Sequence, residues 1–371
     1  MVKDVIKLGD VATYINGYAF KPEDRGEVGL PIIRIQDLTG NAYDLGFYDG
    51  EYPEKIEIND GDVLISWSAS LGVYIWNRGK ALLNQHIFKV VFDKVDIDKN
   101  YFVYAVRQKL DEMGMKTHGA TMKHIVKKDF DATLIPYPSL NKQAEIATNL
   151  NIVFRVIEAR KQEIQLLDDL IKARFVEMFV DKGYPLVALD DLAMGKGEYG
   201  AQSASIEYDP MRPRYVRITD INDDGTLNDD VVSSANVEDD EQYKLSYGDF
   251  MFARMGATVG KTYAYKSGNQ IFAGYLIRYK LNLGKIMPEY LYTYTKLDEY
   301  KNWVVLNQSG AAQPGINAKK YGSLQIPVAP LEEQRKFANF VHQVDKSKVA
   351  VQKALEETQL LFDSMMQKYF G

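Results

Sequence analysis

The stretch IPYPSLNKQAEIATNL (residues 135–150) has a second copy in the same chain, IPVAPLEEQRKFANFV (residues 326–341). The two copies begin 191 residues apart in a chain of 371 residues, and each opens a long segment with helical periodicity. A proline-rich lead-in ends a strand, and the polar residues after it begin a helix, with Glu332 and Glu333 near the positive end of its dipole. The pair predicts a chain built from two equivalent halves.

Three further pairs of segments occur in the same order in both halves. PIIRIQDL from Pro31 matches RYVRITDI from Arg214, GDVLISWSASLG from Gly61 matches GDFMFARMGATVG from Gly248, and GATMKHIVKKDF from Gly119 matches GAAQPGINAKKY from Gly310. The offset between partners drifts only from 183 to 191 residues. We therefore interpret the chain as an internal duplication.

Each half predicts a β-rich domain followed by one long helix. Short β-branched and aromatic runs broken by Gly, Asp and Pro fill the first part, as is typical of a β-rich globular domain with some helix. The second part has apolar residues at alternating steps of three and four, which predicts a coiled-coil seam. We expect the β-rich domains at residues 1–139 and 182–330, with the long helical segments at residues 140–181 and 331–371.

The two seams are expected to bury each other. Polar residues interrupt them only at Arg160, Lys348 and Thr358. Because neither apolar stripe is stable in water, we predict an α+β fold whose two long helices pack as an antiparallel coiled coil with approximate two-fold symmetry. Ordinary helix pairing inside one core is the alternative. The predicted seam consists of Ile146, Leu150, Val153, Ile157, Ile164, Phe337, Val341, Val344, Val351 and Leu355.

Composition limits the classes of protein. The formal net charge of −6 argues against nucleic-acid binding by bulk positive charge alone. The absence of cysteine excludes disulfides and thiolate metal sites and suits a reducing cytosol, so we expect a cytoplasmic protein. No secretory h-region opens the sequence, and no apolar run reaches the length of a membrane span, so we expect no membrane partner.

The repeated segments resemble those of the specificity (S) subunits of type I restriction-modification systems. The resemblance rests on GDVLISWSASLG with ALLNQHIFKV, on the IP-x-P-x-L-x-x-Q lead-in and its second copy, and on the ending FDSMMQKYFG. YGAQSASIEYDP before RYVRITDIN resembles a second target-recognition domain, so the likeness covers nearly the whole chain.

This resemblance implies a division of labour. Each target-recognition domain would read one half of a split double-stranded DNA sequence, with a fold similar to the recognition domain of adenine-N6 methyltransferases. The helices would set the spacing and bind two methyltransferase (M) subunits, with restriction (R) subunits as further partners. It implies no catalytic residue and no cofactor in this chain, because S-adenosylmethionine would belong to the methyltransferase.

Enzymatic interpretations lack their motifs. An adenine methyltransferase needs an N/D-P-P-Y/F loop, and DPMR from Asp209 matches it poorly. No P-D…E-x-K spacing of a metal nuclease occurs. The histidines are too scattered to predict a metal site: His86, His118, His124 and His342. A methyltransferase or nuclease with degenerate motifs, and a coiled-coil protein-binding scaffold, are the alternatives.

One string suggests a dinucleotide site. GKGEYG (residues 195–200) spells G-x-G-x-x-G, but such a site requires the motif to open a helix. The following AQSASIEYDPMRP has two prolines and no helical period, so a glycine-rich loop at the domain edge is the better interpretation.

DNA-contact candidates occur at matched places, because Arg, Asn and Gln read base edges while Lys and Arg bind phosphates. The matched sets are Arg34 and Gln36 with Arg217 and Thr219; Ser66, Trp67 and Ser68 with Arg254 and Met255; Lys123 and His124 with Gln313 and Asn317; and Lys127 and Lys128 with Lys319 and Lys320.

Each set has a structural alternative. Arg34 with Asp37, and Arg217 with Asp220, could be ion pairs of the repeated fold; Trp67 could be core, and the lysines ordinary solvated charges. Two domains with different DNA targets should differ at the residues that contact the bases. The favoured specificity positions are therefore the unlike pairs, Trp67 with Arg254 and Lys123 with Gln313. The acidic run NDDGTLNDDVVSSANVEDDE (residues 222–241) would be repelled by phosphate, so we expect it to face away from the duplex.

Overall fold

The two IP lead-ins form equivalent structure in the computed structural model, which describes residues 4–40, 45–116, 125–309 and 314–371. β10 (Leu134–Pro136) pairs antiparallel with β1 (Val5–Lys7), and β20 (Gln325–Pro327) pairs in the same way with β11 (Leu186–Ala188). Ile135 and Ile326 are fully buried at the centres of these pairs. Each lead-in therefore closes the domain before it and then opens a long helix, α5 (Leu140–Phe179) or α10 (Leu331–Phe370).

The glutamine of each lead-in anchors the start of its helix. The Gln143 side chain accepts a hydrogen bond from the Asp98 backbone N–H at 2.9 Å and donates to the Pro138 carbonyl at 2.8 Å. Gln334 accepts from the Met287 N–H at 2.8 Å and donates to a carbonyl of its own lead-in at 2.7 Å. Both glutamines are fully buried. Their polar groups are satisfied, which is why an amide is tolerated there.

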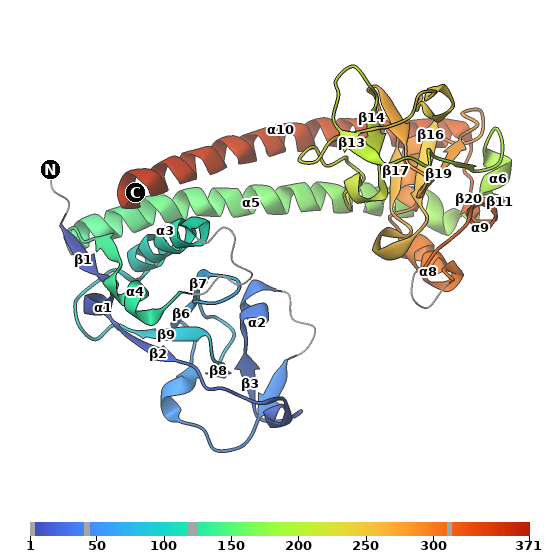
Figure 1. Cartoon of the computed structure of the whole chain (residues 1–371). Helices are drawn as coiled ribbons and strands as arrows, with labels where there is room; N and C mark the ends of the chain where they lie inside the picture. Colours follow the sequence, from blue (N-terminus) through green and yellow to red (C-terminus); the bar gives the residue numbers. More distant parts are fainter. Residues whose placement is uncertain (1–3, 41–44, 117–124, 310–313) are drawn as a thin grey trace. The chain divides into compact units, whose positions relative to one another are not determined.

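The chain divides into two compact units, each described by itself. Unit 1 is Met1–Arg160 with Ala354–Gly371, and unit 2 is Lys161–Lys353. Each unit therefore contains one β-rich domain and part of both long helices, which Figure 1 traces by colour along the chain.

An antiparallel four-stranded sheet is repeated in the two domains. Its order is β2-β9-β6-β7 in unit 1 and β12-β19-β16-β17 in unit 2. The register is equivalent, because Ser66 lies opposite Ile87 in the first sheet and Ala253 opposite Leu276 in the second. The strands are β2 (Thr13–Asn16), β6 (Val63–Ser66), β7 (Gly72–Ile75), β9 (Ile87–Val91), β12 (Glu198–Tyr199), β16 (Asp249–Ala253), β17 (Thr262–Ala264) and β19 (Leu276–Lys280).

A parallel strand pair forms the second repeated layer. In unit 1 it lies within a sheet of order β4-β3-β8-β5, where β3 and β8 run parallel. In unit 2, β14 runs parallel to β18, while β13 pairs with β15. The strands are β3 (Leu30–Ile33), β4 (Gly46–Tyr48), β5 (Glu57–Ile58), β8 (Ala81–Leu83), β13 (Ser205–Glu207), β14 (Arg214–Val216), β15 (Ser233–Ala235) and β18 (Gln270–Phe272).

Short helices complete each domain. In unit 1, α3 (Lys99–Lys116) is continuous, whereas its counterpart in unit 2 is divided into α7 (Pro288–Tyr294) and α8 (Asp298–Asn307). The others are α1 (Leu8–Val11), α2 (Ile35–Thr39), α4 (Lys127–Ala132), α6 (Leu189–Leu192) and α9 (Ala318–Gly322), with 3-10 turns at Pro22–Asp24, Glu54–Ile56, Val180–Lys182, Ile218–Asp220, Glu241–Tyr243 and Gly256–Thr258.

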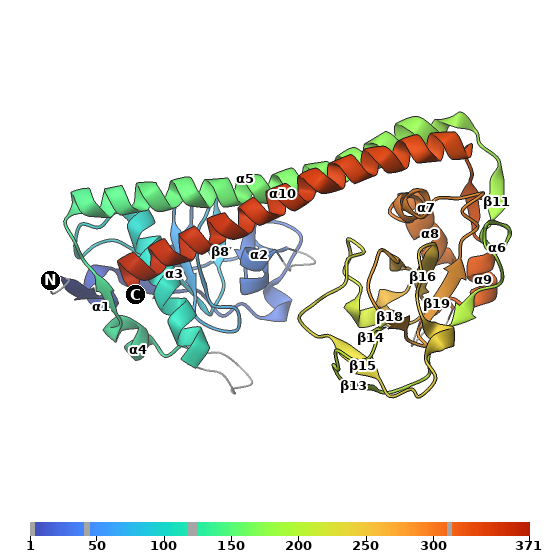
Figure 2. The same cartoon turned by 90° about the horizontal axis from the view of Figure 1, so that it is seen from above.

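The long helices pack against each other within each unit, in opposite directions. In unit 1 the Phe154 and Phe362 rings lie 6.2 Å apart, which joins the first half of α5 to the end of α10. In unit 2 the Phe175 and Phe337 rings lie 5.3 Å apart, which joins the end of α5 to the start of α10. The predicted antiparallel pairing is therefore confirmed, and Figure 2 shows the two helices from above.

Most predicted seam residues are buried in the two cores. Ile146, Leu150 and Ile157 belong to the unit 1 core with Val153 and Leu355 packed against it, while Phe337 and Val341 belong to the unit 2 core and Val344 is also buried. Ile164 and Val351 are half-buried. Lys348, which interrupts the seam, pairs with Asp168 at 2.6 Å across the two helices. In the described part of the chain no helix is long and apolar enough to cross a membrane.

Candidate nucleic-acid interface

The repeated Arg/Asp pairs close a helical turn in each domain. The Asp37 carboxylate accepts from the Arg34 backbone N–H at 2.8 Å and from its Nε at 3.0 Å, with both side chains buried. Asp220 accepts from Arg217 in the same way, at 2.9 Å from the backbone N–H and 2.7 Å from Nη2. This geometry supports the structural ion pair, and the buried Arg34 side chain is engaged by Asp37, so its base contact stays a prediction. Gln36 and Thr219, beside the pairs, are exposed and stay predictions.

Trp67 and Arg254 occupy the same backbone position, one residue beyond the ends of β6 and β16. The Trp67 N–H donates to the His86 carbonyl at 3.2 Å, and the Arg254 N–H donates to the Tyr275 carbonyl at 3.0 Å. Their own carbonyls accept at 2.9 Å from the equivalent residues Ile125 and Ile316. The alignment of Trp67 with Arg254 is therefore a structural equivalence.

Trp67 lies half-buried among three side chains. Its ring stacks on Phe88 with centroids 5.5 Å apart and meets the edge of His86 at 4.9 Å. Its indole N–H donates to the exposed Asn16 carboxamide at 3.3 Å. His86 has a left-handed backbone with φ of 71°, which non-glycine residues adopt rarely and mostly at functional or turn positions. The tryptophan is thus partly core and partly at a polar edge.

Arg254 lies between two exposed tyrosines. Its guanidinium carbon is 5.0 Å from the Tyr199 ring centroid and 5.9 Å from that of Tyr275. The two tyrosines are 42% and 54% exposed, and the Arg254 Nε has no hydrogen-bond partner within the described ranges. Cation–π contacts hold the plane of the guanidinium without using its N–H donors, and the Nε atom itself is buried.

These residues form two equivalent edges. Asn16 lies opposite Phe88 in its sheet as Tyr199 lies opposite Ile277 in the other, so the two positions correspond. Edge 1 is Asn16, Trp67 and His86, and edge 2 is Tyr199, Arg254 and Tyr275. Sequence reasoning found only Trp67 and Arg254 as edge residues. The signal for His86 and Tyr275 was the pair ALLNQHIFKV and IFAGYLIRYK, where matched strands are preceded by unlike side chains.

The neighbours of the two edge positions are less accessible than predicted. Ser66 is fully buried, and its hydroxyl donates to the Ser70 carbonyl at 2.6 Å. Ser68 is buried as well, and its predicted DNA contact stays a prediction. Met255 is half-buried, and its backbone forms a bridge to Gly315. The predicted contacts Lys123, His124 and Gln313 lie outside the described residues.

The two lysines of each doublet differ in how they are held. Lys127 pairs with Asp131 at 2.6 Å, and Lys320 donates to the Asn307 carbonyl at 2.7 Å. Lys128 and Lys319 occupy equivalent places in α4 and α9 and are exposed, with no ion pair to another described residue. Asn317 caps α9 by accepting from the Lys320 N–H at 2.9 Å, which gives it a structural role. Lys128 and Lys319 are therefore the phosphate candidates that the structure favours.

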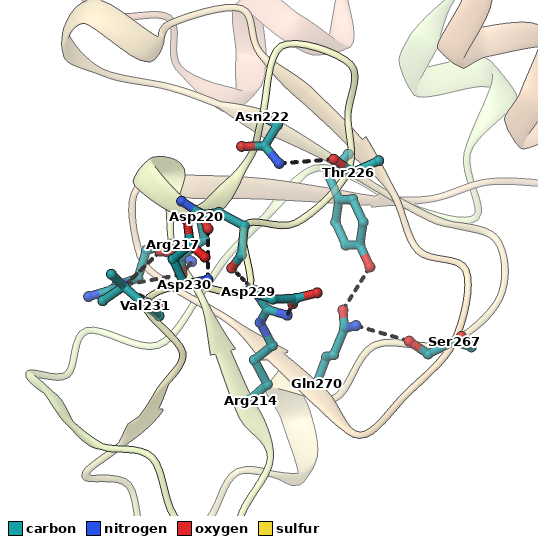
Figure 3. A network of polar contacts seen from close by, with 12 residues as sticks. Arg214, Arg217, Asp220, Asn222, Thr226, Asp229, Asp230, Val231, Ser267 and Gln270 are labelled. Carbon is teal, nitrogen blue, oxygen red and sulfur yellow. Dashed lines mark hydrogen bonds and ion pairs between the residues drawn. The ribbon is translucent and has the colours of Figure 1, made fainter. Parts of the chain in front are cut away.

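The acidic run is partly neutralised by its own domain. Asp229 pairs with Arg214 at 2.5 Å in the network around Arg217 and Asp220 (Figure 3). Asp223 pairs with Lys261 at 2.7 Å. No base-reading role follows for these carboxylates, and their orientation relative to a duplex stays a prediction.

The G-x-G-x-x-G string forms part of a strand. Residues Glu198–Tyr199 form β12, and no helix follows. A Cβ atom at Gly200 would lie 2.3 Å from the Phe272 carbonyl oxygen, so glycine permits two backbones to approach. The string therefore serves sheet packing at edge 2.

Comparison with known proteins gives consistent matches. The family model described as "Type I restriction modification DNA specificity domain" matches twice, at residues 3–168 and 186–359. The chain is 24% identical to the type I restriction enzyme EcoBI specificity subunit of Escherichia coli, with 98% of this chain and 85% of that protein covered.

Two solved structures share the fold. A type I restriction-modification S subunit from M. genitalium matches with a TM-score of 0.56 at 14% identity, covering 99% of this chain and 96% of that one. A chain from a study of complex assembly and conformational transition of the type I R-M system matches with a TM-score of 0.58 at 16% identity, covering 100% and 98%. With the two family matches spanning most of its length, the chain belongs to the type I restriction-modification DNA specificity family.

Proposed function

We propose that this chain is the DNA-specificity subunit of a type I restriction-modification complex and reads a split target, one part with each β-rich domain. The observation that carries this proposal is the pair of edges that share a backbone position and differ in side chains. Edge 1 presents an indole, an imidazole and a carboxamide, while edge 2 presents a guanidinium between two phenols. Guanidinium groups favour guanine and carboxamides favour adenine, so unlike edges suit unlike half-sites.

The proposed division of labour leaves the chemistry to other subunits. The chain is a recognition subunit without a catalytic role, as its family membership implies. Its proposed partners are double-stranded DNA, two methyltransferase subunits bound through the helices, and restriction subunits where the system cleaves DNA. S-adenosylmethionine would be bound by the methyltransferase, and such a complex would act on DNA in the cytoplasm.

The decisive experiment is to map adenine methylation in the host genome with this gene intact and with it deleted. We expect one split motif with a fixed gap to lose its methylation upon deletion, which would also reveal the target. Persistence of every methylated motif, or the absence of any, would contradict the proposal. If a tagged chain then captured no methyltransferase, the protein-binding scaffold would become the better interpretation.

A further inference from the structure

Unit 1 contains a cavity whose counterpart in unit 2 is occupied. The cavity measures about 310 Å³ and lies between β7, α3 and the first half of α5. Figure 1 shows these three elements together in unit 1. Its lining is mixed, with one cation, two carboxamides and no carboxylate: Val73, Tyr74, Ile75, Asn100, Val103, Tyr104, Arg107, Asn151 and Phe154.

Arg107 is the charged group of this cavity. Its guanidinium carbon lies 5.7 Å from the Tyr104 ring centroid and 5.6 Å from that of Phe154. The residue is half-buried, and it makes no hydrogen bond or ion pair with the rest of the described chain. Asp111, one turn further along α3, is a neighbouring charge, but it does not pair with Arg107. A partly desolvated guanidinium with unused donors favours a carbonyl or carboxylate ligand.

Lys296 corresponds to Arg107 in sequence, although it lies just beyond the end of α7, whereas Arg107 lies within α3. The Tyr101 hydroxyl donates to the Pro136 carbonyl at 2.9 Å, and the Tyr290 hydroxyl donates to the Pro327 carbonyl at 2.6 Å. These bonds join equivalent helices to equivalent lead-in strands. Arg107 follows the first tyrosine by six residues, and Lys296 follows the second by six.

An acidic turn fills the counterpart of the cavity in unit 2. The Lys296 ammonium donates to the Asp223 carbonyl at 2.9 Å, and the Tyr292 hydroxyl donates to the Asp224 carbonyl. The Asp223 carboxylate pairs with Lys261 at 2.7 Å. Gly225 packs so closely that a Cβ atom there would lie 2.2 Å from the Tyr292 hydroxyl oxygen. Unit 2 thus shows which chemistry this place in the fold accepts: a tight turn whose backbone carbonyls accept hydrogen bonds from Lys296 and Tyr292, while an acidic side chain of the turn pairs with a neighbouring lysine.

We propose that the unit 1 cavity is the docking site for an acidic turn of the methyltransferase subunit, with Arg107 as its main contact. The inference rests on the proposed function for the identity of the partner. Charge complementarity carries it, because the lining has one positive group and no negative one. We expect the bound turn of the methyltransferase to resemble the turn at Asp223 and Asp224 in unit 2.

The first test is to measure binding of the purified methyltransferase subunit to the full chain by titration calorimetry. We expect Arg107→Glu to weaken the affinity of one bound methyltransferase at least tenfold, and Arg107→Lys to retain it, because Lys296 serves the same place in unit 2. Lys55→Glu is the control: it replaces a cation by an anion at an exposed position of unit 1 that lies outside the cavity and outside both long helices. Equal melting temperatures would exclude unfolding. Wild-type affinity in Arg107→Glu would overturn the inference.

The second test identifies the occupant and uses the absence of cysteine from this chain. Ile75 lines the cavity and is 40% exposed, so Ile75→Cys accepts a benzophenone probe at that site alone. A photo-crosslink to an acidic segment of the methyltransferase would support the proposal. A crosslink confined to this chain, or one to a segment without acidic residues, would overturn it.

The two proposals fail in different ways. If wild-type chain binds methyltransferase and directs methylation while Arg107→Glu does so equally well, the docking site is wrong and the proposed function stands. If the wild-type chain binds no methyltransferase, both proposals are wrong.

Discussion

Trp67 and Arg254 show how one backbone position carries two chemistries. Both donate their N–H to the strand-end carbonyl opposite and accept from an isoleucine at the next segment. Trp67 lowers its exposure by stacking on Phe88, whereas Arg254 keeps its charge at the surface between two rings. The scaffold is therefore constant, and the side chain alone sets what the edge offers to a ligand.

The first prediction concerns these two edge residues. Arg254→Ala should relax base preference in one half-site, because a bidentate hydrogen-bonded pair with a base supplies about 1–3 kcal/mol of discrimination. Trp67→Ala should alter only the other half-site. The measurement is the methylated motif in cells that carry each variant. A preference left intact in both halves by Arg254→Ala would remove it from the base-reading residues.

The second prediction concerns the lysine doublets. Lys127→Ala with Lys128→Ala should weaken DNA binding for all sequences alike and lower the salt slope, by about 0.9 for each phosphate that the variant no longer neutralises. We expect Lys128→Ala to account for most of the change, because Lys127 is already paired with Asp131. The slope is measured from the DNA affinity of the assembled complex over a salt series. An unchanged slope would assign both lysines to the solvated surface.

At the scale of elements, a buried glutamine fixes where each long helix leaves its domain. Gln143 and Gln334 each join the first turn of a long helix to the loop before α3 or α7. An amide that accepts one N–H and donates to a carbonyl holds both segments at once. The same residue occurs in both copies because its amide forms hydrogen bonds with buried backbone groups that would otherwise have no partner.

The third prediction follows from that anchor. Gln334→Leu should destabilise the protein, with each backbone group left unsatisfied costing about 1–3 kcal/mol. The control is Gln343→Leu on the same helix, where the side chain is exposed. Thermal unfolding should show a lower midpoint for Gln334→Leu alone. Equal midpoints for the two variants would argue against the anchoring role.

The fourth prediction concerns the junction between α7 and α8. Burial lowers the pKa of Lys296 from 10.5 to about 8, although Asp224 and Asp223 act in the opposite direction. Between these two pH values the unfolded chain binds a proton that the folded chain has released. The contribution of this lysine to stability therefore rises with pH across that window.

The measurement is the difference in melting temperature between wild type and Lys296→Met from pH 7 to pH 10. We expect the melting temperature of wild type to rise relative to that of the variant as the pH rises above about 8. A difference that is flat with pH, or that moves the other way, would show that Lys296 keeps its proton in the fold.

At the scale of the whole molecule, the duplication gives two domains that are equal in topology and unequal in detail. Each domain supplies one edge, and each unit contains parts of both long helices. α3 is continuous where α7 and α8 are separate, and an acidic turn fills the groove of the second domain. The halves have thus kept their strand register while their surfaces diverged.

The fifth prediction is that the halves are exchangeable. Replacing residues 186–325 with the corresponding domain of a relative should change one half of the methylated motif and leave the other half and the gap unchanged. The boundaries fall at the start of β11 and within β20, so the IP lead-in and its helix stay native. Methylome sequencing reads the result. A change in both halves would contradict independent reading by the two domains.

The sequence by itself determined the duplication, the two long helices, their seam and their antiparallel pairing. Periodicity is local, and an apolar stripe of about five heptads must be buried wherever the helix lies. The segments that carry the family resemblance were recognisable for the same reason, because each is a continuous run.

Only the tertiary structure decided which residues share an edge. Asn16, Trp67 and His86 come from three separate segments, and strand register alone brings them together. It also decided that Arg34 is held by Asp37 and that Ser68 is buried, since a sequence does not show which face of a turn meets the core. The filled groove of the second domain depends on one turn reaching a helix distant in sequence. Contacts of that kind depend on packing between elements, which the local sequence pattern does not reveal.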